Sequence, residues 1–196
     1  MKRMNTMRFH YGGKYRTEDD LKAKKEQHDG AVPFREPDPK KFAIIANGGC
    51  LILLAILLVI CYCVAGISFR EFTPTISIGC IISMAALIPH EFLHAVCFKE
   101  DVYLYHDLSK LLLFVHGTES MSKARFVFMS LLPNIVFGAI PFILFLFNHN
   151  WLILGGIGAF CISMGFGDYI NVFNALTQMP KGAKTFLYGF HSYWYN

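Results

Sequence analysis

The chain has 196 residues, the length of one ordinary domain, but its composition is not that of a soluble one. Hydrophobic residues make up 54% of it and charged residues only 16%, against about a quarter in a typical globular protein. Apolar content this high drives burial and excludes a disordered protein. Residues 1–41 hold 11 Lys and Arg against 7 Asp and Glu, so they carry the whole net charge of +4, and no nucleic-acid partner is expected.

Residues 1–41 form a polar, basic tail that we expect to be mostly extended, because Gly and Pro interrupt any periodic pattern. Four long apolar runs with almost no charge follow, and each predicts a transmembrane helix. These runs cover residues 42–68, 74–98, 126–147 and 151–173. Lys and Arg lie mainly in the tail, after the second run and after the fourth, which predicts that both termini are cytoplasmic. The sequence therefore predicts an all-α membrane protein with four transmembrane helices, made of the tail, a membrane domain over 42–185 and a short cytoplasmic C-terminal tail over 186–196.

The second predicted span ends in His90-Glu91-Phe92-Leu93-His94, which has the pattern H-E-x-x-H. Positions i and i+4 share one face of a helix, so both imidazole rings can bind one metal ion, and zinc suits such nitrogen ligands. Glu91 lies about 100° around the helix from His90, from where its carboxylate can reach a water on the metal and take its proton. The alternative is that the two histidines only form hydrogen bonds between helices.

A short β-hairpin is predicted between the second and third spans. Residues 102–105 and 111–115 have the composition of two strands, and His106, Asp107, Ser109 and Lys110 would connect them. Such a hairpin could simply pack at the membrane interface, or its edge strand could receive an extended peptide by β-addition. The sequence leaves both alternatives open.

Asp168 is the candidate third ligand. A catalytic zinc ion usually has three protein ligands and a water, and the two histidines leave it one ligand short. Apart from Glu91, Asp168 is the only carboxylate inside a predicted span. Counted from the outer ends of their spans, His90 and Asp168 lie about 24 and 26 Å deep at a rise of 1.5 Å per residue, so we expect them at the same level of the bilayer.

Three amide side chains accompany these residues. Asn134 follows Pro133 in the third span, where it could bind an unwound substrate or an oxyanion, or could be one satisfied amide in a kinked helix. Asn171 and Asn174 follow Asp168 by about one and two turns. They could orient the carboxylate, bind a substrate backbone, or cap the helix.

The motif inside a span, with an aspartate in a later span, resembles the site-2-protease-like intramembrane metalloproteases. The whole plan is more similar to a small family of four-span membrane proteins described as putative zincin peptidases of unknown function. The shared features over residues 42–185, beside the basic tail, are H-E-x-x-H late in the second span, Leu132-Pro133, Gly167-Asp168 and Met179-Pro180-Lys181-Gly182.

The resemblance implies one zinc ion held by His90, His94 and Asp168, with Glu91 as general base, in a bacterial cytoplasmic membrane. One feature departs from the site-2 pattern. Those enzymes carry Leu-Asp-Gly around the third ligand, whereas here a glycine precedes Asp168 and Tyr169 follows it.

Two functions compete. The first is an intramembrane zinc metallopeptidase that hydrolyses membrane proteins or peptides within the lipid bilayer by a zinc-activated water. The second is a non-catalytic metal-binding membrane scaffold or sensor, in which a fourth ligand such as Cys97 closes the site. The three obvious ligands inside the spans favour the first function. A small transporter is less consistent, because four spans without an internal repeat do not match the inverted-repeat plan.

Overall fold

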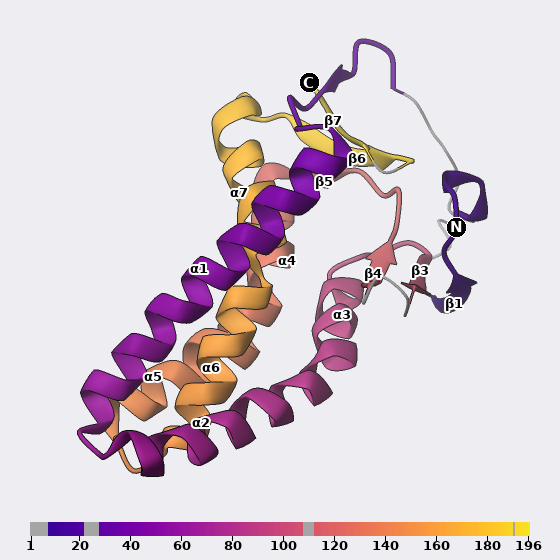
Figure 1. Cartoon of the computed structure of the whole chain (residues 1–196). Helices are drawn as coiled ribbons and strands as arrows, with labels where there is room; N and C mark the ends of the chain where they lie inside the picture. The colour runs from indigo at the N-terminus through magenta and orange to yellow at the C-terminus, as the bar shows by residue number, and fades with distance from the viewer. Residues whose placement is uncertain (1–7, 22–27, 108–111, 190) are drawn as a thin grey trace. The chain divides into compact units, whose positions relative to one another are not determined.

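The computed structural model describes residues 8–21, 28–107, 112–189 and 191–196 (Figure 1). The chain is mostly helical and also contains two small β-sheets. It divides into two compact units. A helical unit contains residues 36–90 and 130–171, and a mixed unit contains residues 1–35, 91–129 and 172–196.

The elements follow one another as labelled in Figure 1. The helices are α1 (Pro39–Ala65), α2 (Phe69–Ser83), the 3₁₀ turn η2 (Met84–Ala86), α3 (Leu87–Val96), α4 (Lys123–Pro133), the π-helix η4 (Asn134–Ala139), α5 (Ile140–Phe147), α6 (Leu152–Met164) and α7 (Phe166–Gln178). The strands are β1 (Phe9–Lys14), β2 (Val32–Pro33), β3 (Val102–Asp107), β4 (Leu112–His116), β5 (Met121–Ser122), β6 (Lys184–Tyr188) and β7 (His191–Tyr195), and a short 3₁₀ turn, η1, covers Glu18–Asp20.

Local sequence signals set the ends of the first two helices. The Asp38 carboxylate accepts the backbone N–H of Lys41 and caps the start of α1, which ends at Gly66 in the left-handed conformation that favours glycine. A capping box, in which Ser68 and Glu71 each accept the other's backbone N–H, starts α2. These caps explain why the chain turns between the first two long helices at residues 66–68.

Three helical stretches are long and apolar enough to cross a membrane: Lys40–Ala65, Phe69–Val96 and Lys123–Phe147. The number becomes four if α6 and α7 count as one span, although the two are bent by 49° where α6 ends at Gly165. Within the described residues the chain therefore has three or four candidate spans, consistent with a multi-pass membrane protein. The bend matters for the site, because Asp168 lies in the first turn of α7, directly after it.

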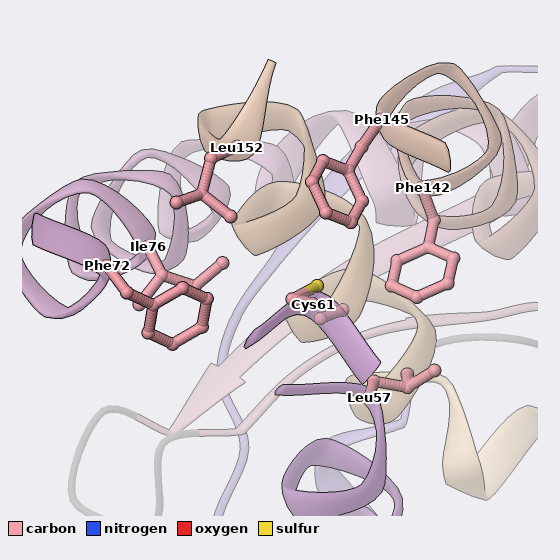
Figure 2. Packing of buried hydrophobic residues seen from close by; sticks show 8 residues of the cluster. Leu57, Cys61, Phe72, Ile76, Phe142, Phe145 and Leu152 are labelled. Carbon is pink, nitrogen blue, oxygen red and sulfur yellow. The ribbon is translucent and has the colours of Figure 1, made fainter. Parts of the chain in front are cut away.

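The helical unit has an apolar core built from α1, α2, α5 and α6. Figure 2 shows its side chains, and those labelled are Leu57, Cys61, Phe72, Ile76, Phe142, Phe145 and Leu152. Helices α2 and α6 approach closely at two glycines. A Cβ atom on Gly79 would overlap the carbonyl of Ile153, and one on Gly156 would press on the carbonyl of Ile76. Small residues allow such close backbone contact between helices.

The mixed unit contains both sheets. One has the strand order β1-β3-β4, with β1 parallel to β3 and β3 antiparallel to β4. The other has the order β2-β7-β6-β5 and is antiparallel throughout. Its apolar core has two clusters, one of Ala95, Phe98, Val102 and Met121 and one of Phe34, Ala175, Met179 and Ala183.

The fold prediction is confirmed for the helices and for the hairpin β3–β4, and it is wrong in treating the chain as all-α apart from that hairpin. Strand β1 comes from the N-terminal tail, and the hairpin β6–β7 extends into the predicted C-terminal tail. Strand β1 contains Gly12 and Gly13 and pairs with residues more than 90 positions away, so no local pattern marks it. The predicted connecting residues Ser109 and Lys110 lie outside the described residues.

Candidate metal centre

The H-E-x-x-H residues lie on α3 and bring three possible metal ligands together. His90, Glu91 and His94 are each partly buried, and one ligand atom from each lies within 4.8 Å of the others. In the part of the chain that the structure describes, no other His, Cys, Asp or Glu residues form a group of three with this spacing. A helical turn separates the two histidines, so the helix alone places both rings on one face.

Asp168 lies beside His90. Its Oδ2 is 3.5 Å from Nε2 of His90, and the two side chains are only 18% and 16% exposed. With metal–ligand bonds of about 2.0–2.1 Å and tetrahedral angles, two ligand atoms lie about 3.3–3.4 Å apart. The observed distance therefore fits two corners of one zinc site within a few tenths of an ångström. Asp168 reaches the motif through His90 and is not a member of the three-residue group.

The amide of Asn134 orients the Asp168 carboxylate. Asn134 is buried, and its Nδ2 donates to Oδ2 of Asp168 at 2.8 Å and to the carbonyl of Ser130 at 3.1 Å. Its side chain occupies the space that a Cβ atom on Gly165 would need. Asn134 is also the first residue of η4, and π-helical turns occur frequently at functional sites. Of the roles predicted for Asn134, the structure displays a hydrogen bond to the candidate ligand.

Glu91 contacts the hairpin. Its Oε2 accepts the backbone N–H of Val115 at 3.0 Å. Val115 lies in β4, an edge strand opposite Leu104 of β3. Because its N–H is directed to Glu91, the edge of the hairpin holds one carboxylate oxygen of the predicted general base.

His94 has a defined partner for its second ring nitrogen. Its Nδ1 lies 2.9 Å from the main-chain carbonyl oxygen of Met129. A carbonyl only accepts hydrogen bonds, so Nδ1 carries the proton and Nε2 keeps the lone pair that binds a metal. Hydrogen bonds of this kind orient most metal-binding histidines in proteins.

A charged pair fixes the chain just after α3. Arg125 donates through Nε and Nη2 to the carbonyl of Cys97 and through Nη1 to Glu119. The other carboxylate oxygen of Glu119 accepts the backbone N–H groups of Lys99 and Glu100. Arg125 and Met129 both belong to α4, so this helix contacts the end of α3 through a side chain and the motif through a carbonyl.

The remaining candidates have other surroundings. The Cys97 thiol donates to the carbonyl of Leu93 at 3.5 Å and does not join the group of ligand atoms described above. Asn174 is buried and accepts a hydrogen bond from Gln178. Asn171 lies partly buried on α7, one turn after the candidate aspartate. The predicted second-shell or substrate roles of the two asparagines stay predictions.

A family model with the description "Putative zincin peptidase" matches residues 83–184, about half of the chain. The chain belongs to this family. The resemblance to these peptidases stated from the sequence is thereby confirmed, while the relation to site-2 proteases stays a prediction. The segment shared with the family contains α3, both strands of the hairpin and Asp168. No curated protein and no solved structure matches the chain.

Three partners of the site residues were not predicted from the sequence: the N–H of Val115, the carbonyl of Met129 and the absent side chain of Gly165. The first two are backbone groups, which every residue type carries, so no residue pattern marks them. Gly165 was visible as a glycine, but its importance depends on the amide that packs against it.

Proposed function

We propose that this zincin-family protein is an intramembrane zinc metallopeptidase that hydrolyses peptide bonds of membrane-associated substrates. The observation that carries the proposal is the 3.5 Å approach of Asp168 to His90, which adds a carboxylate to the two imidazoles of α3. His90, His94 and Asp168 would hold one zinc ion. Three protein ligands are typical of catalytic zinc sites, which keep the fourth position for water or substrate.

Zinc, when bound, would act as a Lewis acid and lower the pKa of a water in its coordination shell toward about 7. Glu91 is the group that would accept the proton of this water and deliver it to the leaving amine. The Val115 N–H holds Oε2 of Glu91, so we assign the proton transfer to Oε1. Asn134 keeps the Asp168 carboxylate in place, and the Met129 carbonyl keeps the ring of His94 in place.

We further propose that α6 and α7 together form a fourth span in a bacterial cytoplasmic membrane, with both termini in the cytoplasm. The distribution of Lys and Arg supports this orientation, since 11 of 18 lie in residues 1–41. The substrate would be a membrane protein or peptide whose helix unwinds at the site, because a helical backbone engages its own carbonyls.

The test compares the wild type with Glu91→Gln in detergent micelles. Both proteins are incubated with a mixed extract of membrane proteins, new N-termini are identified by mass spectrometry, and bound zinc is measured in parallel. We expect Glu91→Gln to keep its zinc and to lose the new N-termini. Equal cleavage by both proteins would sink the assigned mechanism. Bound zinc without cleavage by either protein would favour the alternative, a non-catalytic metal-binding scaffold or sensor.

A further inference from the structure

The carbonyl that orients His94 has an unusual position in its own helix. In an α-helix, the carbonyl of residue i accepts the N–H of residue i+4. For Met129 that residue is Pro133, the last residue of α4, and proline has no N–H. The ordinary helical bond to the Met129 carbonyl is therefore chemically impossible. The hydrogen bond from Nδ1 of His94, at 2.9 Å, goes to this carbonyl.

We propose that Pro133 is a positioning residue of the metal site, which withholds an N–H so that the Met129 carbonyl serves His94. The inference rests on the proposed function for the role of the metal. Pro133 is buried and lies far along the helix from any substrate chemistry that Glu91 performs, so it acts through the carbonyl and the ring. The predicted Leu-Pro feature of the third span thereby gains a chemical purpose besides bending the helix.

The tautomer of His94 is the property that Pro133 controls. A neutral imidazole protonated at Nδ1 has its lone pair on Nε2, whereas the opposite tautomer has none there to offer a metal. A backbone N–H at position 133 would close the helical bond and draw the Met129 carbonyl toward the helix axis. The bond to Nδ1 would become longer and less linear, and hydrogen bonds weaken steeply with such misalignment. Part of the His94 population would then change tautomer.

Pro141 provides a matched control in the same span. It also lacks an N–H, but the carbonyl four residues before it belongs to Phe137, in η4, and not to Met129. Pro133→Ala and Pro141→Ala therefore each restore one backbone N–H to the third span. Only the first of these N–H groups is placed to compete for the acceptor of His94.

The test uses the full chain in micelles, labelled with ¹⁵N at histidine, without metal and without substrate. Nitrogen chemical shifts report the tautomer, and His94→Gln identifies the signal of His94. We expect the wild type to be protonated at Nδ1, Pro133→Ala to show a mixture, and Pro141→Ala to resemble the wild type. Zinc affinity, measured by competition with a chelator, should fall about three- to tenfold in Pro133→Ala alone, below the 10–100-fold typical of removing an outer partner.

Three results would overturn the proposal: a wild-type His94 protonated at Nε2, a Pro133→Ala variant with unchanged tautomer and affinity, or equal losses in Pro141→Ala. The first of these is measured on the unaltered protein, so it decides the question even if Pro133→Ala does not fold. The tautomer measurement needs neither zinc nor cleavage. A failure of the peptidase proposal would therefore leave it standing, and the two failures can be told apart.

Discussion

Gly165→Ala should damage the metal centre without touching any proposed ligand. Gly165 has φ −70° and ψ 7°, which alanine adopts without strain, so the backbone does not oppose the change. The obstacle is the Asn134 amide, which fills the place of the new methyl group. Asn134 is buried, and it would have to move away from the carboxylate of Asp168.

The structure sets the size of the effect. The Asn134 amide donates to Asp168 at 2.8 Å, and a hydrogen bond to a charged group contributes about 1.5–3 kcal/mol. If that bond orients Asp168 as a zinc ligand, its loss should weaken zinc binding by about 10–100-fold, since about 1.4 kcal/mol corresponds to a factor of ten. Asp168 would remain close to His90 but would be free to rotate.

Gly167→Ala is the matched control, because a Cβ atom on Gly167 meets no atom within 4 Å. Zinc affinity of both variants and of Asn134→Ala is measured by competition with a chelator in detergent. We expect Gly165→Ala and Asn134→Ala to lose affinity alike and Gly167→Ala to match the wild type. Wild-type affinity in Gly165→Ala would refute the packing argument, and wild-type affinity in Asn134→Ala would refute the orienting role of the amide.

Two further predictions concern the fold. Gly79→Ala should lower the free energy of unfolding by about 1–3 kcal/mol, because its methyl group presses on the backbone of α6, whereas Gly48→Ala, which meets no neighbour, should not; denaturation in detergent measures both. The backbone N–H and then the ammonium of Lys41 hold the pKa of Asp38 below its ordinary value, so the cap stabilises α1 above the ordinary pKa and is lost as the pH falls through the lowered one. Hydrogen exchange at Lys41 should therefore lose protection on acidification in the wild type but not in Asp38→Asn, which caps equally well without titrating; equal pH dependence in both would contradict this.

The outline of the candidate site was predictable because its signals are local or rare. The spacing of His90 and His94 depends only on helical geometry, and a carboxylate such as Asp168 is conspicuous in an apolar span, where it costs about 2.5–3.5 kcal/mol to insert. The long apolar runs likewise predicted the helices without reference to any partner. The chain positions of all these features are properties of short segments.

Only the tertiary structure decided which groups hold these side chains. The Val115 N–H, the Met129 carbonyl and the space at Gly165 are backbone features, and a backbone group is chemically the same at every residue apart from proline. Whether such a group meets a site residue depends on contacts between segments distant in the chain. The same reason explains why β1 went unpredicted, since its partner strand lies more than 90 residues away.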